Sequence, residues 1–346
     1  MTRLPSPVFR LAAFAGAVLV AALGGCTGPG GEPPEVVVYT ALDQIHSEPI
    51  LLAFERQTGI RVKPVYDTED AKTTGLANRL IARRQRPDCD VHWNNEIVQT
   101  VRLAEMGLLA EYVSPAAARI PERFRDPRGR WTGFAARMRV VLVNTRLVGA
   151  DDLPSSLSDF ADPKWRGQTA MARPFFGTTL THATVLHQRW GGERLAEFLR
   201  DLRANETALC PGNATVRDLV ADGRRAFGLT DTDDAWAAVR AGKPVRVVVP
   251  DAADGAVLSP NTVALVAGCP HPDEGKRLID YLLSREVEQR LARGAGAQVP
   301  LGTDLADEKT PWDDLRTGPT MDVDWVRAAA AIPDVVTLCR EAGMDQ

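Results

Sequence analysis

The stretch VVVYTALDQIHSEPILLAFERQTGIRVKPVY, residues 36–66, decides the fold of this 346-residue chain. It opens with an uninterrupted apolar run over residues 36–39, which is typical of a strand buried on both faces of a sheet. A helix is predicted over residues 49–57, with Ser47 as its cap, and a second strand over residues 60–66. A strand, a helix and a strand joined by short links indicate a βαβ unit with parallel strands.

The same alternation continues along most of the chain, and its length exceeds what one hydrophobic core usually serves, so two lobes are expected. The sequence therefore predicts an α/β protein whose mostly parallel sheets are flanked by helices. Further helices are predicted over residues 73–86, 97–106, 181–190, 195–203, 216–222 and 273–284, and further strands over residues 90–93, 131–144, 226–230, 245–250 and 262–266.

The N-terminus has the pattern of an export signal. Basic Arg3 is followed by an apolar run over residues 11–23, which is too short for a permanent membrane span. The run ends in Leu-Gly-Gly-Cys, which resembles the lipobox of bacterial lipoproteins and predicts acylation of Cys26. Residues 1–25 are then a signal peptide, and the Gly- and Pro-rich residues 26–34 are a lipidated flexible tether. The alternative is an ordinary signal peptide with a chance cysteine.

The net charge of −4 lacks the basic excess of nucleic-acid-binding proteins and gives no reason to expect an anionic lipid partner beyond the anchor. The four remaining cysteines have no zinc-site spacing. Outside the cytosol they form two disulfides or stay buried as small apolar residues. These cysteines are Cys89, Cys210, Cys269 and Cys339.

Acidic and polar residues follow four of the predicted strands. Ligands of open α/β sheets bind beyond the carboxyl ends of strands, so these residues are candidate binding groups. No lysine or arginine lies inside these four short segments, and converging carboxylates without basic partners favour a cation. The alternative is that each acid caps a following helix. The candidates are Thr40, Asp43, Asp67, Trp93, Asn94, Glu96, Asp231, Asp233 and Asp234, and the predicted metal ligands among them are the six acids Asp43, Asp67, Glu96, Asp231, Asp233 and Asp234.

Three further residues are candidates for contact with an anionic or polar group. Arg137 lies within the predicted strand over residues 131–144, where a buried arginine needs an anionic partner. Thr178 and Asn213 lie where helices begin and backbone N–H groups are free to bind a ligand. The alternative for Arg137 is an exposed strand face. No nucleophile elbow, phosphate loop or paired metal-histidine motif is present, so no enzyme is predicted.

From about residue 35 onward the chain is similar to the extracellular solute-binding proteins of ABC importers, and most similar to their ferric-iron-binding branch. The segments that carry this resemblance are residues 36–40, 54–60, 90–96, 103–109, 137–140, 270–284 and 298–301. The resemblance implies a type II periplasmic binding fold, in which two lobes close about a hinge over a ligand in the cleft between them. The implied division places residues 35–136 and 256–302 in lobe 1, and residues 137–255 and 303–346 in lobe 2.

The resemblance also implies a role. We expect a monomeric, extracytoplasmic receptor, held at the membrane by lipid on Cys26, that delivers a small cargo to permease and ATPase subunits and needs no cofactor. The iron branch has adjacent tyrosines where this chain has Asp233 and Asp234. Carboxylates are hard donors as well, so a metal cation, with Fe(III) first, is the expected cargo. The alternatives are an organic cation of polyamine or thiamine type, a small anion or, third, an extracellular carboxylate-dependent hydrolase.

Overall fold

The computed structural model describes residues 33–67, 74–316 and 318–345. The predicted signal peptide, Cys26 and the tether up to residue 32 lie outside the described residues. Residues 33–346 form one compact unit, and the hydrophobic core runs through it. None of the described helices is both long enough and apolar enough to span a membrane.

The strands follow the predicted order, with two short strands that the sequence did not reveal, β5 and β6. The strands are β1 Glu35–Thr40, β2 Arg61–Tyr66, β3 Val91–Asn94, β4 Thr132–Asn144, β5 Thr169–Ala172, β6 Ala208–Cys210, β7 Phe227–Asp231, β8 Val245–Val248 and β9 Leu258–Leu265. They hydrogen-bond in the order β2-β1-β3-β9-β4-β7-β5-β6, and β8 pairs with β4. β1 is parallel to β2 and β3, and β5 is parallel to β6 and β7, as the βαβ pattern predicts.

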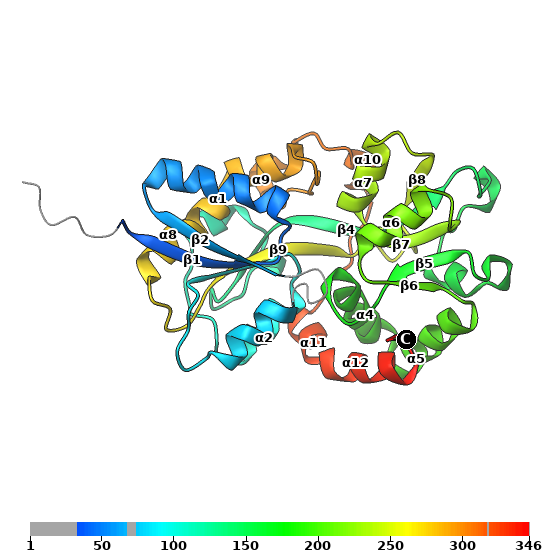
Figure 1. The fold of residues 1–346 in the computed structure, drawn as a ribbon, viewed down its shortest axis with the longest axis horizontal. Helices are drawn as coiled ribbons and strands as arrows, with labels where there is room; N and C mark the ends of the chain where they lie inside the picture. The colour runs from blue at the N-terminus through cyan, green and yellow to red at the C-terminus, as the bar shows by residue number, and fades with distance from the viewer. Residues whose placement is uncertain (1–32, 68–73, 317, 346) are drawn as a thin grey trace, which may run out of the picture. The chain divides into compact units, whose positions relative to one another are not determined.

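Helices cover both sides of the sheet (Figure 1). They are α1 Gln44–Thr58, α2 Thr74–Ala82, α3 Val98–Glu105, α4 Gly177–Trp190, α5 Gly192–Ala204, α6 Asn213–Ala221, α7 Thr232–Arg240, α8 Pro272–Leu282, α9 Arg285–Arg293, α10 Asp313–Arg316, α11 Trp325–Ala330 and α12 Ile332–Glu341. Figure 1 shows α1 and α2 on opposite sides of β1 and β2. We call β1–β3 and β9 with α1–α3, α8 and α9 the first lobe, and β5–β8 with α4–α7 the second lobe.

Several predicted helix boundaries were wrong, and α4, for example, begins at Gly177 rather than near residue 181. Helix α1 begins at Gln44, so Pro49 lies inside it and Ser47 is not its cap. Ser47 is buried in the helix, and its hydroxyl donates to the carbonyl oxygen of Leu42. The prediction placed Pro49 at the first position of the helix. This is the commonest helical position of proline but not its only one. Helix α2 ends at Ala82 rather than at residue 86.

Strand β4 belongs to both lobes. Its first half pairs with β9, and its second half pairs with β7 and β8. A β-bulge interrupts the first half, where Ala135 has a φ of 41°. The N–H group of Ala135 donates to the buried Glu288 carboxylate of α9 at 2.7 Å, which satisfies the backbone group that the bulge removes from the ladder.

Helix α11 contacts both lobes as well. It packs against α3 of the first lobe and α4 of the second, whereas α12 packs against α4 and α5. Helix α11 is thus a second connection between the lobes, besides β4. The four described cysteines are unpaired, which decides between the two alternatives for them: Cys89, Cys210 and Cys339 are buried thiols, and Cys269 is half-buried.

Candidate functional site

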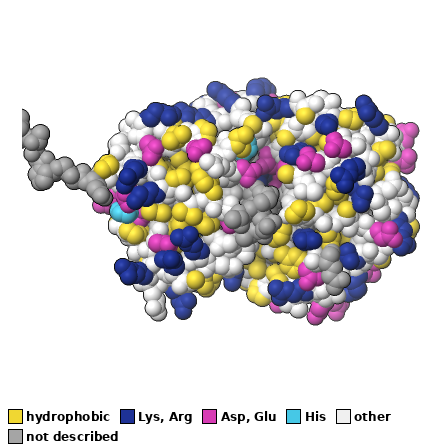
Figure 2. Space-filling view, viewed as in Figure 1, with side chains coloured by type: hydrophobic (Ala, Val, Ile, Leu, Met, Phe, Trp, Pro, Cys, Tyr) yellow, Lys and Arg dark blue, Asp and Glu magenta, His cyan; other side chains and the backbone are white. Residues whose placement is uncertain are grey.

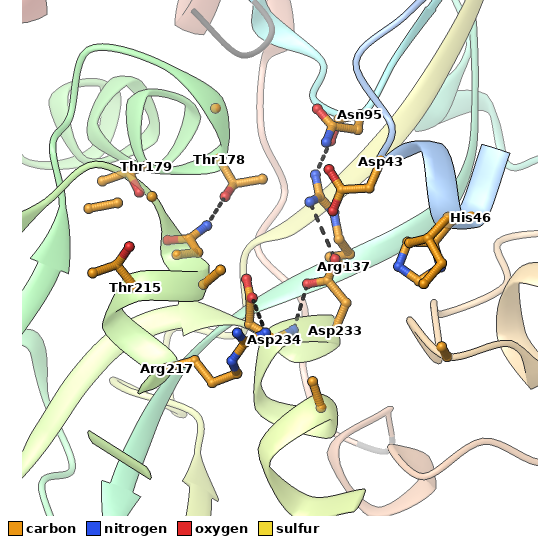
Figure 3. Close-up of a pocket in the computed structure, with 18 of the residues that line it drawn as sticks. Asp43, His46, Asn95, Arg137, Thr178, Thr179, Thr215, Arg217, Asp233 and Asp234 are labelled. Carbon is orange, nitrogen blue, oxygen red and sulfur yellow. Dashed lines mark hydrogen bonds and ion pairs between the residues drawn. The ribbon is translucent and has the colours of Figure 1, made fainter. Parts of the chain in front are cut away.

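A cavity of about 810 Å³ lies where the ends of several strands meet the beginnings of helices from both lobes. The first lobe contributes the start of α1 with Asp43 and His46, and Asn95 after β3. Arg137 projects from β4 between the lobes (Figure 3). The second lobe contributes the starts of α4, α6 and α7. This is the position at which open α/β sheets bind ligands, beyond the carboxyl ends of their strands.

Helices α4 and α6 both begin in the wall of this cavity. Their N-cap residues, Phe176 and Gly212, provide no side-chain oxygen for the first backbone N–H groups. A helix start carries a partial positive charge, so two such starts favour an anionic ligand group. Hydroxyl groups from Thr178 and Thr179 on α4 and Thr215 on α6 line the same wall.

Asp231 lies behind this wall and holds it together. It is fully buried at the end of β7, and one carboxylate oxygen accepts from Arg139 of β4 at 2.7 Å. The other oxygen accepts from Thr178 at 2.5 Å and from Asn213 at 3.0 Å, which ties the starts of α4 and α6 together. Burial opposes the ionisation of Asp231, but Arg139 and Arg137 outweigh it and hold its pKa below the usual value.

Arg137 occupies the space between the acids. Its Nη1 lies 3.5 Å from an oxygen of Asp231 and 3.6 Å from an oxygen of Asp233, and its Nη2 donates to the backbone oxygen of Asn95. Figure 3 shows Asp43 alongside the same guanidinium group. A protein cation therefore already neutralises this acidic cluster, although no lysine or arginine lies within the short loops that carry its acids.

Asp233 and Asp234 open the first turn of α7 and face the cavity (Figure 3). Burial raises the pKa of Asp233, and the neighbouring carboxylates of Asp231 and Asp43 raise it further against the attraction of Arg137. Asp234 accepts from Arg217 of α6 at 3.4 Å. Carboxylate oxygens of Asp231, Asp233 and Asp234 lie within 4.8 Å of one another, a spacing compatible with a shared cation.

Glu96 joins the two lobes close to the cavity but does not line it. Its buried carboxylate accepts from the backbone N–H groups of Val98 and Gln99 at the start of α3, and from the Thr181 hydroxyl of α4 at 2.7 Å. Burial raises the pKa of Glu96 to about 7, because none of its described hydrogen-bond donors is a cation. The hydrogen bonds from Thr181, Gln99 and Val98 and the more distant Arg137 act in the opposite direction. The contact links the lobes through an ionisable group.

The structure brings half of the predicted site residues to the cavity wall. The six that line it are Asp43, Arg137, Thr178, Asn213, Asp233 and Asp234. Asp231 lies directly behind the wall, bonded to Thr178 and Asn213. The remaining predicted residues do not line this cavity. They are Thr40, Asp67, Trp93, Asn94 and Glu96.

These five residues have other contacts in the structure. Thr40 accepts from the N–H of Leu42, and Asp67 accepts from the N–H of Leu76 in α2. Trp93 is a core residue, with its ring 5.9 Å from that of Phe134. The Asn94 amide donates to Glu96. Turn and capping roles, which the sequence analysis kept as the alternative, therefore describe Asp67 and Glu96 in this structure.

Several residues of the cavity wall were missed. Four of them lie within three residues of predicted site residues, so the same strand ends and helix starts already indicated them. These are His46, Asn95, Thr179 and Thr215. Arg217 is four residues after Asn213 and thus on the same face of α6, which helical spacing alone could have revealed. No sequence signal pointed to Arg240, at the far end of α7.

A family model described as bacterial extracellular solute-binding protein matches residues 100–323. The Fe(3+)-binding periplasmic protein of Serratia marcescens is 23% identical, over 89% of this chain and 90% of the relative. A putative 2-aminoethylphosphonate-binding periplasmic protein of Salmonella typhi is 25% identical, over 80% of this chain and 79% of the relative. The crystal structure of iron-bound HitA from Pseudomonas aeruginosa superposes with a TM-score of 0.78 at 24% identity, covering 90% of this chain and all of that one.

Proposed function

The chain belongs to the bacterial extracellular solute-binding protein family, and we propose that it is the receptor of an ABC importer for a small zwitterionic solute. The solute would carry a phosphate- or phosphonate-like anion and a positively charged group. The family and these relatives are binding proteins of transport systems rather than enzymes, so capture and release of a solute are the chemistry to explain. Closure of the two lobes about β4 would enclose the solute, which would then pass to the permease.

One observation carries the choice of cargo. The starts of α4 and α6, whose N-cap residues make no side-chain cap hydrogen bond, line the same cavity as Asp43, Asp233 and Asp234. The helix starts, with Arg217 beside them, favour an anionic group on one side. The carboxylates favour a cationic group on the other side. The relative that bears the name of 2-aminoethylphosphonate supports this combination, because that molecule has one group of each kind.

A metal cation is the second candidate. The spacing of Asp231, Asp233 and Asp234 and the names of the iron-binding relatives favour it, and iron remains the first metal to test. Against it, the Arg137 guanidinium lies between Asp231 and Asp233, where a bound metal would have to displace it or accept its repulsion. Asp231 is moreover committed to Arg139, Thr178 and Asn213.

Thermal unfolding with added probes separates the two candidates. We expect 2-aminoethylphosphonate to raise the melting temperature, because a ligand at 100 times its Kd stabilises by about 2.7 kcal/mol. Ethylphosphonate, which lacks the amine, should bind more weakly. Fe(III) citrate and Mn²⁺ should leave the melting temperature unchanged. Stabilisation by a metal alone would reject the zwitterion in favour of the second candidate.

Two variants locate the groups of the solute. Asp233→Asn should weaken 2-aminoethylphosphonate more than ethylphosphonate, because it removes a partner of the amine only. Thr215→Val should weaken both probes alike, because it removes a hydroxyl beside the anionic group. Equal losses in both variants for both probes would contradict the assignment of the two sides of the cavity.

We also propose that lipid on Cys26 holds the receptor at the membrane. Cys26→Ser should move the protein from the membrane fraction to the soluble extracytoplasmic fraction. Labelling with radioactive palmitate provides the direct readout. A protein that remains soluble with Cys26 intact would show that the signal peptide is an ordinary one.

A further inference from the structure

The N-terminal ends of β1, β2 and β3 form one edge of the sheet, at the end of the strands away from the cavity (Figure 1). The described chain begins at this edge, with Pro33 just before β1. The link from α2 to β3 returns to the same edge and contains the sequence Arg-Arg-Gln-Arg over residues 83–86, whose side chains are exposed. Figure 2 shows Lys and Arg side chains at this end of the molecule, interspersed with acidic and hydrophobic ones.

Carboxylates at this edge each pair with more than one cation. Glu35 accepts from both Arg61 and Lys63, each at 2.7 Å, and these two cations are about half exposed. Hydrogen bonds from Lys63 and Arg61 lower the pKa of Glu35 to about 2, so it stays ionised, yet a single negative charge is shared by two positive ones.

The same arrangement occurs at the end of α2. The carboxylate of Asp88 lies 2.9 Å from Arg79 and 3.2 Å from Arg83, so one acid again faces two cations. Among the described residues, no carboxylate pairs with Arg84 or Arg86: Arg84 donates only to the backbone oxygen of Ile81. These two guanidinium groups leave a surplus of positive charge at the edge among the described residues.

The acids of the neighbouring helices have contacts of their own. Asp273 at the start of α8 is paired with Lys276 at 3.2 Å, and Glu55 of α1 accepts from the backbone N–H of Val62. The net charge of −4 of the whole chain thus conceals a basic edge, defined here as Arg61, Lys63, Arg83, Arg84 and Arg86. The expectation of no attraction to anionic lipid rested on the net charge, which does not describe how the charge is distributed over the surface.

We propose that the basic edge binds the anionic headgroups of the membrane to which the tether is attached. The inference rests on the lipid anchor proposed above. The residues between Cys26 and Pro33 span at most about 25 Å when extended, so the edge where the chain enters the fold stays close to the membrane surface. A basic residue near an anionic surface is attracted by about 1 kcal/mol, within a Debye length of about 10 Å at 0.1 M salt.

Binding through this edge would fix the orientation of the receptor. The strands run away from the edge toward the cavity, so the membrane contacts one end of the first lobe while the cavity remains open to solvent. Several weak attractions from one rigid edge would add to the anchor without burying apolar surface. The lipid chain then holds the protein at the membrane, and the basic edge decides which side faces it.

Co-sedimentation with vesicles tests this inference without the anchor. Residues 33–346 form a compact unit, so residues 27–346 can be used, free of the apolar run and of Cys26. We expect binding to vesicles of phosphatidylcholine with 30% phosphatidylglycerol, and none to phosphatidylcholine alone. Binding should disappear in 1 M NaCl, where the Debye length falls to about 3 Å. Equal sedimentation with both kinds of vesicle would overturn the proposal.

A charge-matched pair of variants locates the surface. Arg84→Glu with Arg86→Glu should weaken binding to the anionic vesicles at least tenfold. The same change at two exposed arginines of the second lobe, Arg200→Glu with Arg224→Glu, should leave it within about twofold. Equal losses in both pairs would show attraction to net charge and overturn the proposal. If the first pair fails to fold, the Arg84→Gln with Arg86→Gln variant should show a smaller loss in the same direction.

Because these vesicles carry no solute, the outcome is independent of the cargo. Failure of vesicle binding with intact palmitate labelling at Cys26 would reject the basic edge and leave the anchor. Failure of labelling with intact vesicle binding would do the opposite.

Discussion

Asp231 and Glu96 are two fully buried carboxylates, one at a strand end in each lobe, and they differ in what surrounds them. Asp231 lies between Arg139 and Arg137, and its pKa falls below the usual value. Glu96 has only neutral donors within hydrogen-bond distance, and its pKa rises to about 7. Burial is the same in both cases, so the presence of a paired guanidinium decides whether the buried acid is charged.

The largest effect is expected from Asp231→Asn. The change leaves Arg139 buried without its anion, and breaking a buried ion pair on one side costs about 3–5 kcal/mol of the free energy of unfolding. Urea unfolding at pH 7 measures this loss. Asp234→Asn is the matched control on the same turn: Asp234 is partly exposed and its arginine lies 3.4 Å away, so about 1 kcal/mol or less is expected. Similar costs for both changes would contradict the comparison.

Glu96→Gln should change stability in a way that depends on pH. The pKa of Glu96 is raised from 4.5 to about 7, so the folded state binds a proton that the unfolded state releases between these values. The buried charge therefore costs nothing below pH 4.5, and its cost grows to roughly 3 kcal/mol above pH 7.

Relative to the native protein, the free energy of unfolding of the Glu96→Gln variant should thus rise by roughly 3 kcal/mol between pH 4.5 and pH 7.5. Urea titrations at both pH values give the two differences. A difference that stays constant would show that Glu96 ionises normally, and the contrast with Asp231 would fail.

The smallest effect is expected from Thr181→Val, which removes the interlobe donor to Glu96. Loss of one hydrogen bond to a buried charged group should cost about 1.5–3 kcal/mol above pH 7 and less at pH 4.5, where the carboxyl is neutral. The pKa of Glu96 should rise further, because the Thr181 hydroxyl acts to lower it. Carbon-13 NMR of the labelled carboxyl group measures the shift.

A neighbouring threonine supplies the control for Thr181. Thr184 is also buried and donates to the backbone oxygen of Thr181 within α4. Thr184→Val should therefore leave the pKa of Glu96 unchanged. If both variants moved it equally, packing of α4 rather than the interlobe hydrogen bond would set the ionisation of Glu96.

The βαβ pattern was readable because it is local. The apolar run before Thr40 and the glycine after α1 are signals within a few residues of each other, and the structure confirms the parallel strands that they predict. Strands β5 and β6 were missed, since three or four residues give too short a pattern to distinguish from a loop.

The site was only partly readable because its charges come from distant segments. The acids after β7 were visible together in the sequence, but the arginines that neutralise them arrive from β4, some 90 residues earlier. Counting basic residues within each loop could not reveal Arg137 beside Asp233. The composition of single loops therefore favoured a bound cation as the cargo. In the folded protein, the Arg137 guanidinium group already provides a positive charge among these acids.

The two arginines of β4 alternate with Met138, which is buried on the opposite face. Because successive side chains of a strand point to opposite faces, the loss or gain of one residue between Ala136 and Val140 would present a thioether to the cavity and turn both guanidinium groups away from Asp231. The number of residues in this strand is thus under stricter constraint than their identity.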